Sequence, residues 1–149
     1  MAYGAIANGG QLMKPLRADA NDSSKQVIRR VLSEESALES REILRQVVLR
    51  GTGKNAISAL YSTAGKTASG YMPDLTQWDL VERKQRPNYA GFIGFAPVNN
   101  PRVEVYVGIF DPDTGTGGAH GGEHAAPVFK TIVESVLKYM KVAPDNKML

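Results

Sequence analysis

Two neighbouring apolar segments, residues 89–96 and 102–110, constrain the fold of this chain most strongly. In the second, Val103, Val105, Val107 and Ile109 alternate with other residues, which is the period of a strand with one buried face. The first is equally apolar and carries glycines at 91 and 94. Between them, residues 97–101 hold two prolines and two asparagines, a composition typical of a turn. The two segments therefore predict an antiparallel hairpin.

The surrounding segments predict helices and further strands. Apolar residues recur at helical spacing from Leu38 to Val48, and Gly51 closes that helix. Ser33 or Ser36 offers its N-cap, and Ser36 has capping-box spacing to Glu39. A second stripe over 128–140 predicts a last helix with Pro127 in its first turn and Pro144 beyond its end. We also expect a buried helix at 1–7 stopped by residues 8–10, a short strand near 12–16, strands at 26–32 and 57–69, and long loops at 71–88 and 111–122.

This order of elements indicates an α+β domain in which helices pack on an antiparallel sheet. The 149 residues suffice for one domain or part of one, with a core over about 1–142 and a polar tail at 143–149. Because residues 1–7 read as the middle of a helix, we expect a fragment that lacks its upstream part. Such a fragment should expose apolar surface and associate with itself or with a complementary chain.

Composition narrows the classes of function. The absence of cysteine excludes disulfides and thiolate metal sites. The net charge of +3 is too small to indicate nucleic acid as a partner. No apolar run approaches the roughly 20 residues that span a bilayer. The longest basic cluster, residues 83–86, is interpreted as a solvated loop.

The segment with the strongest chemical character is residues 64–70, Ala-Gly-Lys-Thr-Ala-Ser-Gly. It places Lys66 next to the Thr67 hydroxyl among small residues, which let another backbone approach closely. A cation beside a hydroxyl is a ready receptor for a carboxylate. Taken alone, the pair is more typical of a solvent-facing strand end, and only the flanking segments favour a binding site.

Two other motifs invite different chemistry. Residues 51–54 (Gly-Thr-Gly-Lys) resemble the end of a phosphate loop, but Val48 stands where its first glycine belongs and Asn55 replaces the Mg²⁺-binding hydroxyl. His120, Glu123 and His124 match the H-x-x-E-H zinc pattern, which leaves a zinc hydrolase as a remote alternative. Two glycines between the histidines disfavour the required helix by roughly 2 kcal/mol. We therefore expect no metal and no cofactor.

The motif at 64–70 resembles the A-G-K-[TS]-G-T strand of class B penicillin-binding protein transpeptidase domains. Four further segments are similar to the family in the same order: 2–10 (A-Y-x-x-x-A-N-G-G), 47–56 (V-V-x-x-G-T-G-x-x-A), 89–97, and 121–129 (G-G-x-x-A-A-P-V-F). The resemblance spans residues 1 to about 142. It implies the partial fold of a penicillin-binding, β-lactamase-like transpeptidase domain.

The resemblance also implies a function: peptidoglycan D,D-transpeptidation, the cross-linking of cell-wall stem peptides by serine acyl transfer. Lys66 and Thr67 would bind the carboxylate of a stem peptide or β-lactam, and the backbone N–H of Ser69 would be an oxyanion-hole donor. Ala68 stands where the family has glycine, which puts substrate fit in doubt if its Cβ points into the cleft. Implied partners are the remainder of the transpeptidase domain and proteins of cell-wall synthesis or division. The implied location is the periplasmic face of the inner membrane, with an anchor in a missing N-terminal segment.

The family's serine nucleophile motif, S-x-x-K, and its S-x-N motif both precede the Lys-Thr strand, and neither stands there in this chain. Ser135 and Lys138 do match S-x-x-K, but they follow that strand and lie in the last helix, so we interpret the match as coincidence. The chain alone is predicted to be inactive. A non-catalytic binding or assembly module with the same fold remains the alternative, and it requires that no S-x-x-K precede this segment.

Overall fold

The computed structural model describes residues 1–16, 26–71, 88–113 and 118–146. The elements in chain order are α1 (Ala2–Ala7), β1 (Gln11–Met13), β2 (Val27–Arg30), α2 (Glu34–Arg50), the 3₁₀ turn η1 (Lys54–Ala56), β3 (Ala64–Tyr71), β4 (Asn88–Ala96), β5 (Val103–Phe110) and α3 (Gly121–Tyr139). The α+β prediction is confirmed. The predicted loops at 71–88 and 111–122 and the basic cluster at 83–86 fall wholly or partly outside the described residues.

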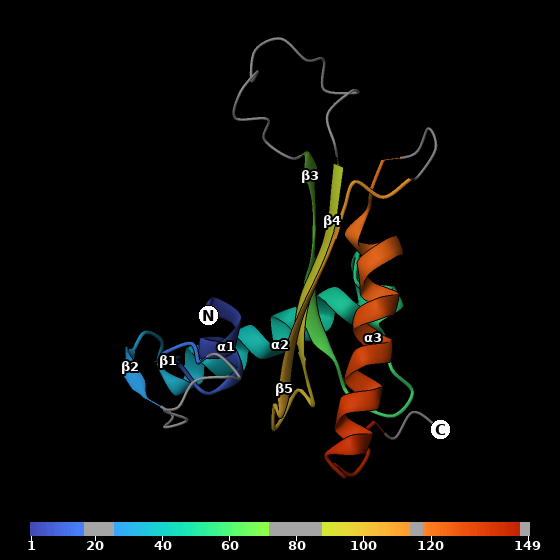
Figure 1. The fold of residues 1–149 in the computed structure, drawn as a ribbon. Coiled ribbons are helices and arrows are strands. Elements are labelled where there is room, and N and C mark those ends of the chain that lie inside the picture. The colour runs from blue at the N-terminus through green and yellow to red at the C-terminus, as the bar shows by residue number, and fades with distance from the viewer. Residues whose placement is uncertain (17–25, 72–87, 114–117, 147–149) are drawn as a thin grey trace, which may run out of the picture.

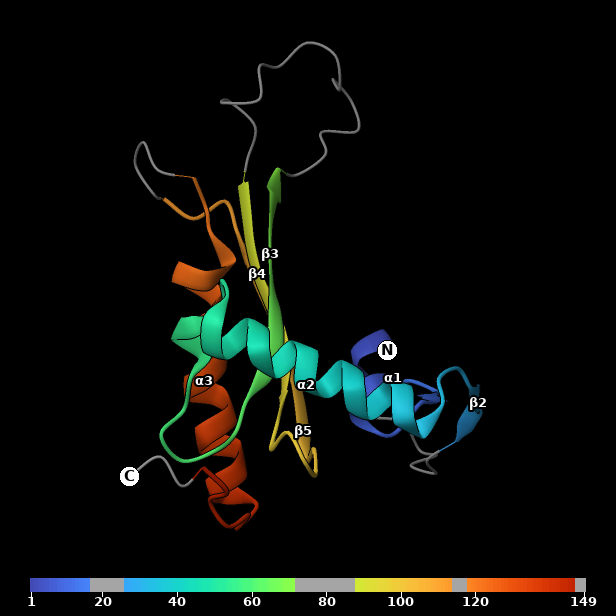
Figure 2. The same cartoon turned by 180° about the vertical axis from the view of Figure 1, so that it is seen from behind.

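The central sheet has three antiparallel strands in the order β3-β4-β5. The predicted hairpin is confirmed: β4 pairs with β5 from Tyr89↔Phe110 to Ala96↔Val103. Strand β3 pairs with the other side of β4, from Ala64↔Phe95 to Tyr71↔Asn88. Helix α3 lies along one face of this sheet, and α2 crosses the strands steeply on the β3 side (Figures 1 and 2).

The main core lies between α3 and the sheet. Phe92 of β4 and Phe129 of α3 are fully buried, with ring centroids 4.7 Å apart. Val133 and Leu137 continue the same contact one and two turns further along α3. The apolar stripe predicted for the last helix is thus core at these three positions, whereas Val128, Ile132 and Met140 of the same stripe remain exposed. Helix α3 begins at Gly121, however, so the prediction that Pro127 lies in its first turn is wrong.

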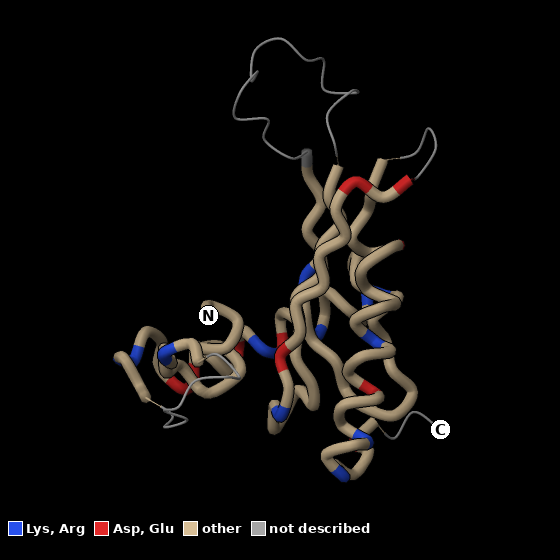
Figure 3. Tube along the Cα trace, viewed as in Figure 1, with Lys and Arg blue, Asp and Glu red and all other residues tan. Residues whose placement is uncertain are grey.

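A smaller cluster packs on the opposite face of the sheet, where Ala64, Phe95 and Val98 meet Ile6 and Leu44. This cluster attaches α1 and α2 to the sheet where β3 begins and β4 ends. Helix α1 and the β1–β2 hairpin lie together to one side of the sheet (Figure 1). Charged residues are dispersed over this lobe, the sheet and α3 (Figure 3).

Local signals explain where two helices end or begin. Helix α1 stops before Gly9 and Gly10, whose φ values of +83° and +100° favour glycine. Glycine is needed at position 10 for a second reason as well, because a Cβ there would collide with the Leu32 carbonyl oxygen. Helix α2 is capped by Ser33, whose Oγ accepts a hydrogen bond of 3.1 Å from the Ser36 backbone N–H. Ser33 is therefore the N-cap, and the capping box from Ser36 is not formed.

Several apolar side chains remain exposed on the described residues. Leu38 and Ile43 of α2 are 57% and 65% exposed, so only part of the predicted stripe of α2 is buried. Tyr106 and Phe110 of β5 are exposed on the sheet face away from α3, where Phe110 stacks on Tyr89 at 6.0 Å. These exposed side chains agree with the expected exposure of apolar residues. The association of this chain with itself or with a complementary chain stays a prediction.

The predicted strand at 57–69 is correct only from Ala64 onward. Residues 58–62 instead follow an irregular path held by side-chain hydrogen bonds. The Ser58 Oγ accepts from the backbone N–H groups of Leu60 and Tyr61, and Asp145 accepts from the N–H and Oγ of Ser62. These bonds satisfy backbone groups that a strand would have paired with a neighbour.

Candidate functional site

Strand β3 lies at an edge of the three-stranded sheet, and no other described strand pairs with its free side. Its residues alternate between the two faces. Lys66 shares a face with its cross-strand neighbour Ile93, away from α3, whereas Thr67 and Ser69 point toward the start of α3. An edge strand leaves a row of backbone N–H and C=O groups unpaired, so it can accept another extended chain.

The Lys66 side chain is exposed and folds back along its own strand. Its Nζ donates to the Thr67 carbonyl oxygen at 3.1 Å and lies 3.3 Å from the Thr67 Oγ1. Within the described part of the chain no carboxylate pairs with it. The ammonium and the neighbouring hydroxyl are thus adjacent, and the charge of Lys66 is available to an anion.

The Thr67 hydroxyl has a second partner, Thr52, which the sequence reasoning did not single out. The two Oγ1 atoms are 2.8 Å apart, and either can be the donor. Thr52 directly follows Gly51, the C-cap of α2. The Gly-Thr-Gly motif at 51–53 was the available signal, but its spacing from Thr67 could not indicate that the two hydroxyls meet.

Ser69 ties β3 to the beginning of α3. Its Oγ accepts a hydrogen bond of 2.9 Å from the backbone N–H of Gly121. The approach is close because Gly121 has no side chain: a Cβ there would collide with the Gly91 carbonyl oxygen and lie 2.6 Å from that of Ala68. The first turn of α3 therefore rests directly on the backbones of β3 and β4.

The next residue extends this junction to the segment after α2. The Asn55 Nδ2 donates to the Gly122 carbonyl oxygen at 2.8 Å, and a Cβ on Gly122 would collide with the Thr52 carbonyl oxygen. A hollow of about 520 Å³ lies at this junction and is lined by Gly51, Thr52, Lys54, Asn55, Thr67, Ser69, His120, Gly121, Gly122 and Glu123. Two segments distant in the sequence, 51–55 and 120–123, thus pack against β3 at Thr67 and Ser69.

Ala68 lies on the Lys66 face and is accommodated by glycine on the neighbouring strand. Its Cβ would be 3.4 Å from a Cβ built on Gly91, its cross-strand partner. The ring of Tyr89 also leans over Gly91. Burial, and then the charge and hydrogen bond of Tyr106, raise the pKa of the Tyr89 phenol. The methyl group is therefore directed over the sheet toward β4.

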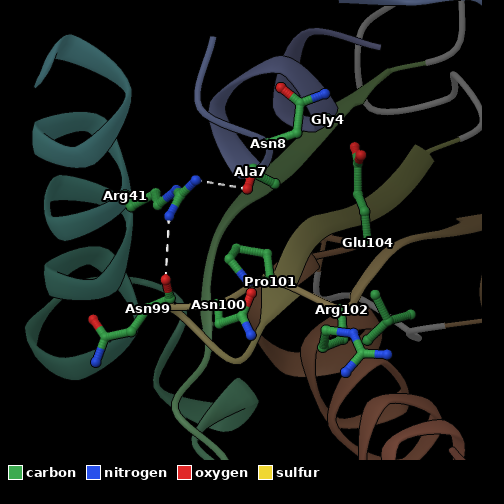
Figure 4. A pocket seen from close by; sticks show the side chains of 10 residues that line it. Gly4, Ala7, Asn8, Arg41, Asn99, Asn100, Pro101, Arg102 and Glu104 are labelled. Carbon is green, nitrogen blue, oxygen red and sulfur yellow. Dashed lines mark hydrogen bonds between the residues drawn. The ribbon is translucent and has the colours of Figure 1, made fainter. Parts of the chain in front are cut away.

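A second hollow, of about 360 Å³, lies on the other side of the fold near α1 (Figure 4). Arg41 of α2 forms its wall and donates to the carbonyl oxygens of Ile6 at 3.0 Å, Ala7 at 2.8 Å and Asn99 at 3.4 Å. Burial lowers the pKa of this guanidinium. Glu104 lines the same hollow, and burial raises the pKa of its carboxyl, partly offset by the N-terminal amino group. Arg41 accordingly joins α2 to the end of α1 and to the β4–β5 turn.

The residues of the zinc alternative do not form a metal site in the described ranges. His120 is the exposed residue that precedes α3, and His124 is half-buried within it. No three histidine, aspartate or glutamate side chains of the described residues come close enough to share a metal ion.

The S-x-x-K match at Ser135 is also remote from the Ser69 end of β3. Ser135 lies fourteen residues beyond Gly121 along α3, which at 1.5 Å per residue is about 21 Å. Both Ser135 and Lys138 are exposed on that helix. The geometry agrees with the interpretation of this match as coincidence. Among the described residues no helix is long and apolar enough to cross a membrane.

Comparison with known proteins identifies the family. The penicillin binding protein transpeptidase domain matches residues 1–134. The chain is 33% identical over 158 aligned residues to stage V sporulation protein D of Bacillus subtilis, covering 99% of this chain and 23% of that protein. It is 32% identical to the probable peptidoglycan D,D-transpeptidase PenA of Neisseria flavescens, covering 99% of this chain and 35% of that one.

A solved structure agrees with these relatives. The apo transpeptidase domain of Burkholderia pseudomallei penicillin-binding protein 3 superposes with a TM-score of 0.78 at 36% identity. The match covers 97% of this chain and 42% of that one. The chain belongs to the penicillin-binding protein transpeptidase family, and it spans between about a quarter and under half of the length of these relatives.

Proposed function

We propose that this segment forms the carboxylate-binding wall of a peptidoglycan D,D-transpeptidase. The observation that carries the proposal is the exposed Lys66 ammonium 3.3 Å from the Thr67 hydroxyl, on a strand whose outer edge is unpaired among the described strands. Relatives carry the name peptidoglycan D,D-transpeptidase, which supports the reaction class. The substrate is the C-terminal part of a cell-wall stem peptide, and a β-lactam takes the same place.

Each site residue has one task in this proposal. Lys66 and Thr67 bind the substrate carboxylate by charge-assisted hydrogen bonds, which are about twice as strong as neutral ones. The substrate backbone lies along the free edge of β3 as an added strand. The Ser69 N–H donates to the oxyanion of the tetrahedral intermediate, and loss of one such donor typically costs on the order of 10²–10³ in rate.

The nucleophile comes from outside this segment. A serine with its lysine, in an upstream S-x-x-K motif, attacks the substrate carbonyl, and the C-terminal D-amino acid leaves as its C–N bond breaks. An amine of a second stem peptide then displaces the serine oxygen and completes the cross-link. The remainder of the transpeptidase domain is thus the obligatory partner, and proteins of cell-wall synthesis or division are further partners. The reaction takes place on the periplasmic side of the inner membrane, to which the longer polypeptide is anchored.

A fluorescent penicillin tests the proposal. The 149-residue chain should not be labelled covalently, whereas the longer polypeptide that joins it to the upstream serine should be. In that polypeptide, Lys66→Ala should lower the second-order acylation rate constant by about 10- to 150-fold, the equivalent of one hydrogen bond to a charged group.

The matched control is Lys138→Ala, which removes an exposed lysine on α3 and should leave the rate unchanged. Labelling of the short chain would refute the missing nucleophile. A longer polypeptide that carries no S-x-x-K and takes up no label would favour a non-catalytic module.

A further inference from the structure

We propose that Thr52 is a positioning residue that orients the Thr67 hydroxyl so that its proton faces an incoming carboxylate. This inference rests on the proposed function, because it assigns a control to the same carboxylate site. It gives the Gly-Thr-Gly turn at 51–53 a role in substrate recognition. Thr52 itself touches Thr67 and not the substrate.

The backbone around Thr52 is fixed on both sides. The Gly51 N–H and the Gly53 N–H both donate to the Val47 carbonyl oxygen, at 3.0 and 3.2 Å, which anchors the turn to the last turn of α2. On the other side, Gly122 packs so closely that a Cβ would collide with the Thr52 carbonyl oxygen. The hydroxyl of Thr52 is therefore presented to Thr67 from a position set by both α2 and α3.

The number of hydrogen bonds that the Thr67 hydroxyl can donate and accept explains why its contact with Thr52 matters. A hydroxyl donates one hydrogen bond and accepts two. Lys66 Nζ is a donor only, so it occupies one lone pair of the Thr67 Oγ1 at 3.3 Å. If Thr67 donates to Thr52, its single proton is used; if Thr52 donates to Thr67, both lone pairs are filled and the proton is free.

A bound carboxylate determines which of the two threonines donates, because a carboxylate only accepts hydrogen bonds. It can bind the Thr67 hydroxyl only in the arrangement in which Thr52 is the donor. Among the described residues Thr52 Oγ1 has no other hydrogen-bond partner, so its proton is free to turn toward Thr67. Lys66 and Thr52 together make Thr67 a hydrogen-bond donor. Its bond to a charged carboxylate is stronger than its bond to the carbonyl oxygen of an uncharged ester, so this arrangement favours the acid.

The test compares two probes on the longer polypeptide: benzylpenicillin, which has the carboxylate, and its methyl ester, which does not. Thr52→Val removes the hydroxyl and keeps the shape, whereas Thr52→Ser keeps the hydroxyl. Thr52→Val should lower acylation by benzylpenicillin by about 2- to 10-fold, the range for one neutral hydrogen bond, and lower the ester rate less, so that the acid-to-ester ratio falls. Thr52→Ser should restore the preference for the acid. Thr52→Ala serves as a second deletion if the valine variant is poorly folded.

Thr67→Val separates the possible failures. If Thr67→Val lowers the acid-to-ester ratio and neither Thr52→Val nor Thr52→Ala does, the role of Thr52 is overturned and the proposed function stands. If Thr52→Val lowers both rates equally, its role is structural only and the inference is wrong. If Thr67→Val also leaves the ratio unchanged, the carboxylate assignment fails and the inference falls with it.

Discussion

Gly121 is a residue at which a single added methyl group should be strongly destabilising, because α3 begins in direct contact with the backbones of β3 and β4. In Gly121→Ala the new Cβ would collide with the Gly91 carbonyl oxygen and lie 2.6 Å from that of Ala68. Ordinary contacts of a Cβ begin near 3.4 Å, so the start of α3 must move away by roughly 1 Å. That shift stretches the 2.9 Å hydrogen bond from the Gly121 N–H to the Ser69 Oγ.

Two terms set the size of the effect. Forcing an extra methyl into a packed site typically costs about 1–3 kcal/mol, and the lost hydrogen bond adds about 1 kcal/mol. We therefore expect Gly121→Ala to lower the free energy of unfolding by about 2–4 kcal/mol in urea denaturation of the 149-residue chain.

The chain offers a matched control in Gly118→Ala, where the nearest atom to the new Cβ is 3.8 Å away. This variant should change stability by less than about 0.5 kcal/mol or stabilise slightly, because alanine restricts the unfolded chain. If Gly121→Ala proves as stable as Gly118→Ala, the close packing of α3 on β3 and β4 is not real, and the account of how β3 is held is refuted.

Two further predictions concern other parts of the fold. Asp145→Ala should lower the free energy of unfolding by about 2–3 kcal/mol, because the Asp145 carboxylate accepts hydrogen bonds from both the N–H and the Oγ of the buried Ser62. The control Glu39→Ala removes an exposed carboxylate and should change the free energy of unfolding by under about 0.5 kcal/mol. Equal effects of the two variants in thermal melts would argue against the contact between Asp145 and Ser62. Burial raises the pKa of Glu104 above the ordinary value of a glutamate, so the folded chain holds that proton more tightly than the unfolded chain. Stability should therefore fall as pH rises from the ordinary glutamate pKa through the folded pKa, and Glu104→Gln should remove this fall in urea titrations at pH 4 and pH 7. An identical pH dependence in both proteins would contradict the assignment.

The parts of the fold that follow local patterns could be predicted from the sequence. The β4–β5 hairpin has a period of two and a turn composition, and α3 has a continuous apolar stripe, so neither needs distant residues to define it. The α2 helix was equally clear, but its pattern could not show that Leu38 and Ile43 remain exposed. Exposure depends on what packs against each face, which a periodicity does not contain.

The failures occurred where distant segments determine the local path. The start of β3 was placed too early because Asp145 supplies hydrogen bonds to Ser62 from far along the chain. The start of α3 was placed too late because two adjacent glycines have low helix propensity, whereas here Gly121 and Gly122 are what allow the helix to approach the sheet.

In the candidate site, too, the residues of a local motif could be predicted from the sequence, whereas a contact between distant segments could not. The motif at 64–70 was recognisable by composition and order, and the structure places Lys66 and Thr67 together on an edge strand. Thr52 was not found, although its motif was noticed, because only the tertiary structure brings its hydroxyl to Thr67.

The most direct measurement of the central claim is a crystal structure of the longer polypeptide acylated by benzylpenicillin. The account predicts that the penicillin carboxylate lies about 2.7–3.2 Å from both the Lys66 Nζ and the Thr67 Oγ1. It also predicts the acyl carbonyl oxygen within the same distance of the Ser69 N–H. A carboxylate bound elsewhere, with Lys66 still folded along β3, would contradict the account.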